Sequence, residues 1–327
     1  IHNEKRVRNT VERLHPLVGA RINSTAKGVC YEARYGVHHA GYLSDHRVAG
    51  AIVLPTTAEL EAATAVGRMQ FGTSRVSFDD AMHHQAMSFA NGEDRIVRVL
   101  VTPLKSDRAS FRLVSAAAED SDVWHTHMTG TLRKSDVPPR PAFSTKQVRA
   151  RCQQTLPVAD FYDRLGGLGL EYGPSFRGVR ELYVGQHEAL TKVGLPDGLA
   201  NTQYAMHPAF LDACLHAYPF VLDDADKAGS DGRKSYLPVS LEGFRCYQDE
   251  IDEAWVHTTL RSVEKDDTQV VDIRIYDVAE RPVAELEGLA VRLLPLDKVA
   301  PARADDLFYR AVWRKSIGVA ANLAVDR

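Results

Sequence analysis

One arrangement of elements occurs twice along this chain. A stretch of alternating polar and apolar residues with a glycine in its middle occurs at residues 124–133 and again at residues 284–292, about 160 positions later. The two clearest helix starts, Thr56 and Pro208, have nearly the same separation. Because short β-rich stretches surround each helix, we expect two similar halves, each with one long helix wrapped by a curved antiparallel sheet.

The first predicted helix begins where Thr56 and Glu59 have the spacing of a capping box. We expect Glu59, Glu61 and Arg68 to face solvent from this helix. The second helix is predicted from Pro208 to about residue 222, since proline is favoured in the first turn. Strands are predicted at residues 75–89, 96–104, 110–116 and 124–133, and at residues 181–184, 189–194, 254–263 and 270–277. The expected fold class is therefore α+β, a double hotdog.

A proline-rich stretch at residues 136–141 divides the chain, and its composition suits an extended connection over the surface. The last part of the chain departs from the repeated pattern, and both ends are charged, as expected of a piece of a longer polypeptide. We therefore expect an N-terminal linker (residues 1–14), an N-terminal hotdog (15–135), an inter-hotdog linker (136–157), a C-terminal hotdog (158–297) and a linker to a following domain (298–327).

The charge balance excludes several classes of partner. The chain has 327 residues, with 40 lysines and arginines against 43 aspartates and glutamates, and a formal net charge of -3. A nucleic-acid footprint and a membrane-binding surface therefore have little support. No apolar run approaches the roughly 18–20 residues of a membrane span, and the first residues are too charged for a secretion signal, so we expect a cytoplasmic location.

The sequence also lacks the usual patterns of metal and cofactor sites. The four cysteines, Cys30, Cys152, Cys214 and Cys246, are widely spaced, which favours reduced, packed thiols over a zinc or redox site. Neither a G-x-G-x-x-G motif nor a P-loop is present, so we expect no metal, nicotinamide or flavin.

A first candidate for chemistry lies in the N-terminal half, where His46, Gly50 and Pro55 form an H-x3-G-x4-P motif. A strand would carry His46, Gly50 would let a ligand approach the backbone, and Pro55 would end the strand ahead of the helix. On these three residues alone, a structural histidine is the favoured interpretation.

A second candidate lies in the apolar second helix, where Asp212 and His216 fall on one face and can share a hydrogen bond. Burial among apolar side chains raises a carboxyl pKa, which would make Asp212 a general acid near neutral pH. A structural Asp–His pair on a solvent-facing side is the other interpretation. Tyr172, Gly173 and Pro174 form a tight turn whose tyrosine could hydrogen-bond a ligand or the acid, or could anchor the loop.

Four motifs together resemble the dehydratase domains of modular polyketide synthases. They are H-x3-G-x4-P at residues 46–55, YGP at residues 172–174, HPAFLDACLH at residues 207–216 and LPVS at residues 237–240, in that order, and the resemblance extends from residue 15 to about residue 296. It implies a double hotdog with one active site shared between the halves.

The resemblance also implies a role for each site residue. His46 would remove the α-proton of a β-hydroxyacyl thioester, Asp212 would protonate the departing β-hydroxyl, and His216 would orient Asp212. The backbone N–H of Gly50 would hold the thioester carbonyl as negative charge develops on it. The substrate would arrive on the phosphopantetheine of an acyl carrier protein, with neighbouring domains of the same synthase and a second copy of the chain as further partners.

Two alternatives remain. Many members of the family have glycine after the motif proline, whereas this chain has Thr56 and Thr57, and some relatives with the same catalytic pair also close an oxygen ring or shift the double bond. A bifunctional dehydratase of that kind is the first alternative. The second is an inactive hotdog that binds acyl chains or serves as a structural module, against which the presence of both His46 and Asp212 argues.

Overall fold

The structure is a computed structural model that describes residues 14–23, 28–89, 93–117, 122–135, 144–223, 234–265 and 267–299. The predicted linkers at 1–14 and 298–327 lie almost wholly outside the described residues, as does the proline-rich stretch 136–141. Within the described part of the predicted inter-hotdog linker, α2 (Thr145–Arg151) and β10 (Gln154–Thr155) form regular elements.

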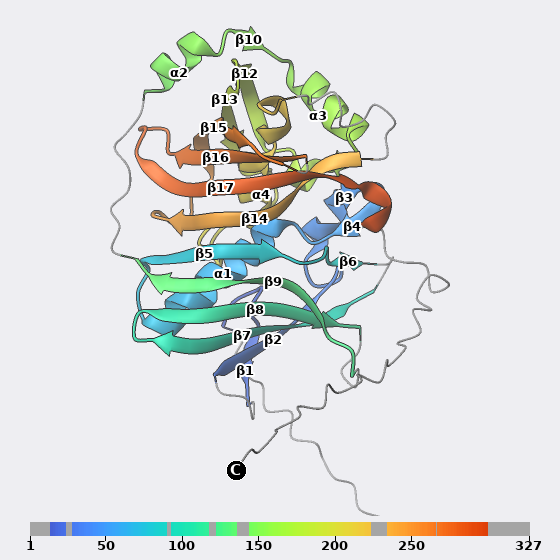
Figure 1. The fold of residues 1–327 in the computed structure, drawn as a ribbon, viewed down its shortest axis with the longest axis vertical. Coiled ribbons are helices and arrows are strands. Elements are labelled where there is room, and N and C mark those ends of the chain that lie inside the picture. The colour runs from blue at the N-terminus through green and yellow to red at the C-terminus, as the bar shows by residue number, and fades with distance from the viewer. Residues whose placement is uncertain are drawn as a thin grey trace, which may run out of the picture.

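A 13-stranded antiparallel sheet runs through both halves (Figure 1). The halves join in its middle, where β5 pairs with β14. The N-terminal half contributes, in spatial order, β1 (Ala20–Ile22), β2 (Val29–Tyr35), β7 (Arg95–Lys105), β8 (Arg108–Ala116), β9 (His125–Lys134) and β5 (Val76–His83). The C-terminal half contributes β14 (Lys234–Cys246), β17 (Pro282–Pro295), β16 (Thr268–Tyr276), β15 (Glu253–Val263), β13 (Glu188–Gly194), β12 (Val179–Val184) and β10. The expected α+β double hotdog is thus the observed architecture.

One helix lies behind the sheet in each half, and the two helices contact each other (Figure 1). They are α1 (Thr56–Phe71) and α4 (Pro208–Leu215), so both predicted helix starts are confirmed. The predicted end of the second helix near residue 222 is wrong. Pro219 cannot donate a backbone hydrogen bond and its ring crowds the preceding turn, so α4 ends at Leu215 and the 3₁₀ turn η3 (Tyr218–Phe220) follows.

A small second sheet joins the halves at another point. Its strands, in order, are β11 (Leu170–Tyr172), β3 (His46–Val48), β4 (Ala51–Val53) and β6 (Ser88–Phe89). β11 comes from the C-terminal half and the other three strands from the N-terminal half. In the chain, β11 follows α3 (Val158–Gly167). The 3₁₀ turns η1 (Gly41–Asp45) and η2 (Pro174–Phe176) flank the small sheet, and η5 (Leu296–Lys298) follows β17.

The prediction that Glu59 and Glu61 face solvent from α1 is wrong. Glu59 and Glu61 are each only 1% exposed, because α1 packs against the large sheet and against α4. Partners from elsewhere in the chain compensate their charges: Glu59 lies 3.0 Å from His83, and Glu61 accepts backbone N–H bonds from the segment before α4. The predicted capping box is also absent, since Pro55 is the N-cap of α1 and no side chain caps it.

Glycine is required for different structural reasons at the two matching positions of the repeat, Gly130 and Gly288. A Cβ at Gly130 would overlap the ring of Phe78 on the neighbouring strand, whereas Gly288 has a φ of +63°, in the left-handed region.

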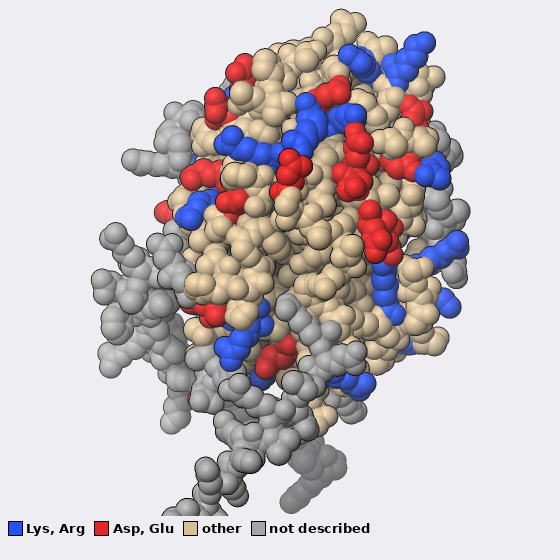
Figure 2. Space-filling model, turned by 180° about the vertical axis from the view of Figure 1, so that it is seen from behind, with Lys and Arg blue, Asp and Glu red and all other residues tan. Residues whose placement is uncertain are grey.

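On the face shown in Figure 2, basic and acidic side chains intermix over the upper part, and the described residues there form no continuous basic surface. Among the described helices, none has both the length and the apolar character required to cross a bilayer.

Candidate active site

His46 is the first residue of β3 and is 8% exposed. Its Nδ1 lies 2.8 Å from the carbonyl oxygen of Val53, on the adjoining strand β4. Because a carbonyl only accepts, Nδ1 carries the proton and donates to Val53, which leaves the lone pair of the neutral ring on Nε2. That Nε2 lies 3.8 Å from Oδ2 of Asp212. The structure therefore brings together the histidine and the aspartate singled out in opposite halves of the sequence.

Asp212 lies in the middle of α4 and is 7% exposed. Its Oδ2 accepts a hydrogen bond from Nε2 of His216 at 2.9 Å, one helical turn further on. Its Oδ1 lies 3.3 Å from the hydroxyl of Thr57, at the start of α1.

The electrostatics of Asp212 differ from the expectation based on its apolar neighbours. Burial raises its pKa, but the charge of His46 and the hydrogen bonds from His216 and Thr57 lower it by more, so the pKa lies below its ordinary value. The predicted rise of the Asp212 pKa is wrong in direction, because the sequence of α4 does not show the partners that come from β3 and α1. Burial lowers the pKa of His216, which therefore acts as a neutral N–H donor.

Tyr172 reaches the site through strand pairing, since β11 places it directly opposite His46 on β3. Its ring centroid lies 3.8 Å from that of His216 and 5.7 Å from that of His46. Burial and the charge of Asp212 raise the pKa of Tyr172 well above its ordinary value, so its hydroxyl stays protonated. The contacts described for the Tyr172 side chain are ring contacts, and a hydrogen bond to Asp212 is not among them.

The turn formed by Gly173 and Pro174 is held against the residue before His46. Gly173 N–H donates to the carbonyl of Asp45 at 2.7 Å, and Ser175 N–H donates to Oδ2 of Asp45 at 2.9 Å. Pro174 starts the turn η2, which brings the Phe176 ring to 5.1 Å from that of His46. Asp45 and Phe176 were missed in the sequence, and the available signal for Asp45 was an acid directly before the candidate histidine.

Gly50 and Pro55 shape the backbone on either side of β4. Gly50 is exposed in the turn between β3 and β4 with a φ of +78°, and its N–H donates to Oε1 of Glu171 at 3.0 Å. The substrate-carbonyl role that the resemblance gives this N–H stays a prediction, in which the thioester oxygen would replace Glu171 as its acceptor. Pro55 ends the segment after β4 and caps α1.

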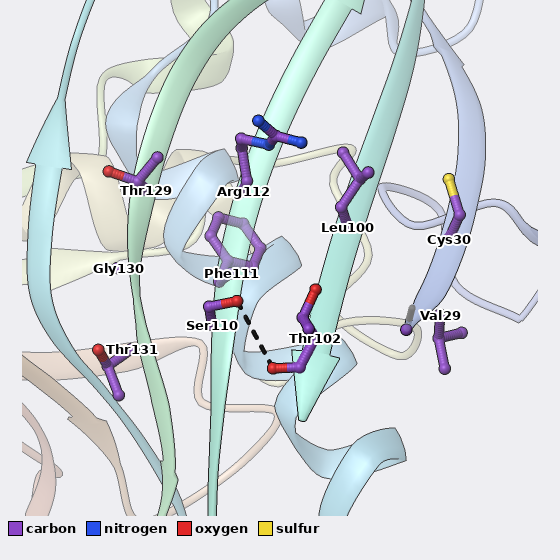
Figure 3. Close-up of a pocket in the computed structure, with 11 residues that line it drawn as sticks. Val29, Cys30, Leu100, Thr102, Ser110, Phe111, Arg112, Thr129, Gly130 and Thr131 are labelled. Atoms are coloured by element: carbon purple, nitrogen blue, oxygen red, sulfur yellow. Dashed lines mark hydrogen bonds between the residues drawn. The ribbon is translucent and has the colours of Figure 1, made fainter. Parts of the chain in front are cut away.

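A hollow of about 510 Å³ lies away from this pair, on the strands β2, β7, β8 and β9 (Figure 3). Its described lining includes Arg112, Cys30 and the hydrogen-bonded Ser110 and Thr102, but no histidine or carboxylate. It therefore lacks the groups for acid–base chemistry. Across the described residues, no group of three or more His, Cys, Asp or Glu side chains is arranged to hold a metal ion.

Comparison with models of protein families gives the same family as the motifs in the sequence. The family model described as "Polyketide synthase dehydratase domain" matches residues 15–116, and the model described as "Polyketide synthase dehydratase N-terminal domain" matches residues 140–301. Together the two matches cover most of the chain.

Individual relatives give the same result. The polyketide synthase GfsA of Streptomyces halstedii is 30% identical over 329 residues, which is 96% of this chain and 4% of that protein. The polyketide synthase PksN of Bacillus subtilis (strain 168) is 26% identical over 290 residues, 86% of this chain and 5% of that protein. This chain thus spans only a small part of either relative. The solved dehydratase domain from the CurK module of curacin polyketide synthase has 25% identity and a TM-score of 0.78, covering 88% of this chain and 100% of that one. The chain belongs to the dehydratase domains of polyketide synthases, a family of hydro-lyases with the double-hotdog fold.

Proposed function

We propose that this domain eliminates water from a β-hydroxyacyl thioester borne by an acyl carrier protein, with His46 as the base and Asp212 as the acid. The observation that carries the proposal is the 3.8 Å approach of His46 Nε2 to Asp212 Oδ2, two buried groups contributed by different halves. Two solved variants of CurK dehydratase, a histidine-to-phenylalanine and an aspartate-to-asparagine variant, are described as inactive, which supports one histidine and one aspartate as the essential pair.

The reaction requires both groups at once. The proton beside a thioester is weakly acidic and hydroxide is a poor leaving group, so a base and an acid must flank the Cα–Cβ bond. The Nε2 lone pair of His46 takes the α-proton, the electrons of that C–H bond form the double bond, and the C–O bond breaks as Asp212 gives its proton to the oxygen. The products are the enoyl thioester and water. The enzyme is left with a proton on His46 and a carboxylate at Asp212, and transfer between them restores the starting state.

The lowered pKa of Asp212 fits this cycle. In the substrate-free site, the charge of His46 and the hydrogen bonds from His216 and Thr57 favour the carboxylate form of Asp212. An acyl chain bound between the groups excludes water, and a low dielectric disfavours two separated charges. Substrate binding would therefore favour the protonated form of Asp212, which is the form that the reaction needs.

The test is incubation with a synthetic β-hydroxyacyl thioester on carrier protein or pantetheine. We expect loss of the mass of one water together with enoyl absorbance, and a large loss of rate in His46→Ala and in Asp212→Asn. His125→Ala and Asp163→Asn, at exposed positions, are the matched controls and should keep the wild-type rate. An unchanged rate in either site variant contradicts the proposal.

The same assay separates the alternatives. A product without enoyl absorbance but with the mass expected for ring closure would favour a bifunctional cyclase, and absence of turnover by the wild type would favour an acyl-binding or structural module. The proposal includes an acyl carrier protein and neighbouring synthase domains as partners, a homodimeric state and a cytoplasmic location. The large size of the relatives, of which this chain spans 4–5%, supports the neighbouring domains.

A further inference from the structure

Thr57 connects the two halves of the protein at the acid. It is the second residue of α1 and is fully buried. Its hydroxyl oxygen lies 3.0 Å from the carbonyl oxygen of Pro208 and 3.3 Å from Oδ1 of Asp212. Both acceptors belong to α4, so a side chain of the N-terminal half contacts the carboxylate of the C-terminal half.

The two acceptors compete for one hydroxyl proton. Pro208 is the first residue of α4, so its carbonyl is also in position to accept the N–H four residues on, which belongs to Asp212 itself. That carbonyl does not depend on Thr57 for a partner. Oδ1 of Asp212 does, because Thr57 is the one described residue whose hydrogen bond reaches it.

The two oxygens of Asp212 thus have different surroundings. Oδ2 lies 3.8 Å from His46 and accepts from His216, while Oδ1 lies toward Thr57. Both oxygens therefore have a hydrogen-bond donor, and the bond from Thr57 fixes the orientation of the carboxyl group so that Oδ2 stays turned toward His46. Oδ2 is the oxygen next to His46, where the reacting carbon chain must lie under the proposed function.

Resting on that function, we propose that Thr57 is a positioning residue: its hydroxyl donates to Oδ1 of Asp212, so that the carboxyl group is held with Oδ2 next to His46, where the leaving hydroxyl must receive its proton. A hydrogen bond to a carboxylate is stronger than one to a neutral carboxyl group. The bond from Thr57 therefore strengthens as Asp212 loses its proton, which favours the transition state over the bound substrate.

Several other titratable groups face Asp212 and set the background for any change at Thr57. They are His46 on β3, His216 after α4, Tyr172 on β11, Tyr162 on α3, Tyr218 in η3 and Cys214 on α4. The hydrogen bond from Thr57 is among the interactions that lower the pKa of Asp212, so its removal should raise that pKa while these groups stay in place.

The test uses the isosteric variant Thr57→Val and the hydroxyl-retaining variant Thr57→Ser. Thr64→Val is the matched control, because Thr64 is buried on the same helix but its hydroxyl donates to Leu60 within that helix. We expect Thr57→Val to lower kcat about ten-fold with KM within about two-fold, as for an interaction made chiefly in the transition state. Thr57→Ser should restore most of the rate, and Thr64→Val should leave it unchanged. If the valine variant does not fold, Thr57→Ala takes its place.

A second measurement does not depend on turnover. In protein labelled with ¹³C at the aspartate carboxyl carbons, the Asp212 signal, assigned with Asp212→Asn, should titrate at higher pH in Thr57→Val than in the wild type. If the wild type fails to release water but this shift appears, the proposed function fails while the Thr57 contact stands. If Thr57→Val keeps both the wild-type rate and the wild-type titration, or if Thr57→Ser is as slow as Thr57→Val, the positioning role is overturned.

Discussion

The backbone N–H of Gly173 donates to the carbonyl oxygen of Asp45 at 2.7 Å, and Asp45 directly precedes His46. The approach is so close that a Cβ added at Gly173 would lie within 2.8 Å of the Asp45 side chain. We predict that Gly173→Ala lowers the free energy of unfolding by about 1–3 kcal/mol, the usual cost of overpacking. It should also slow dehydration, since the loop and the His46 strand must separate. Denaturant unfolding and the thioester assay measure the two effects.

Gly166→Ala is the matched control for that change. Gly166 is an exposed position of α3, where an added Cβ meets nothing within 4 Å. Alanine is favoured over glycine inside helices by about 1 kcal/mol, so this variant should be as stable as the wild type or more stable. If Gly173→Ala behaved like Gly166→Ala in both measurements, the close packing of the loop on Asp45 would be wrong.

Glu61 ties α1 to the segment that leads into α4. Its Oε1 accepts from Ala205 N–H at 2.7 Å and its Oε2 accepts from Met206 N–H at 3.1 Å. In Glu61→Gln one of these buried N–H groups would face an amide NH₂ and lose its acceptor. We predict a loss of about 1–3 kcal/mol in the free energy of unfolding, measured in urea at neutral pH.

The control for Glu61 is Glu171→Gln. Glu171 also accepts a backbone N–H, from Gly50 at 3.0 Å, but at an exposed position where one amide oxygen suffices. Its unfolding free energy should stay within about 0.5 kcal/mol of the wild type. Equal effects of the two substitutions would contradict the role of Glu61 as a buried double acceptor.

The ion pair between Glu59 and His83 should make part of the protein's stability depend on pH. Burial lowers the pKa of His83, but the charge of Glu59 3.0 Å away raises it by more, so the pKa lies above its ordinary value of 6.5. A folded-state pKa above the unfolded one stabilises the protein at pH below the unfolded value, and this contribution disappears as pH rises through the folded value. The stability advantage of the wild type over Glu59→Gln should therefore shrink from pH 6 upward through the His83 titration. NMR titration of His83 checks the same point, and a pKa below 6.5 in the wild type would refute it.

The duplication and the helix starts at Thr56 and Pro208 could be predicted because they depend on local patterns, namely periodicity and the positional preference of proline. The burial of Glu59 and Glu61 could not, because their partners, His83 and the N–H groups before α4, lie far along the chain. Charged residues at helical spacing predict a solvent-facing side only where no second layer covers them.

The same limit applies at the site. Asp212 could be chosen from the sequence because a lone acid in an apolar helix is unusual, and His46 because its motif, together with the others, resembles that of the dehydratase family. The direction of the Asp212 pKa could not be predicted, since it depends on Thr57 and His46 from the other half. Asp45 was missed because its role lies in accepting backbone N–H groups from a loop that the sequence does not place beside it.

His216 offers the sharpest test of how the acid is held. Its Nε2–H donates to Oδ2 of Asp212 at 2.9 Å, and its ring lies against Tyr172. A glutamine at this position can supply an amide N–H, whereas a leucine cannot. Since that hydrogen bond lowers the pKa of Asp212, we predict that His216→Leu raises it. The alkaline limb of the rate profile, where the acid loses its proton, should then move to higher pH, and kcat should fall by about ten-fold or more. His216→Gln should keep the wild-type limb and most of the rate. Identical pH profiles for the leucine and glutamine variants would show that the N–H of His216 does not set the proton affinity of Asp212.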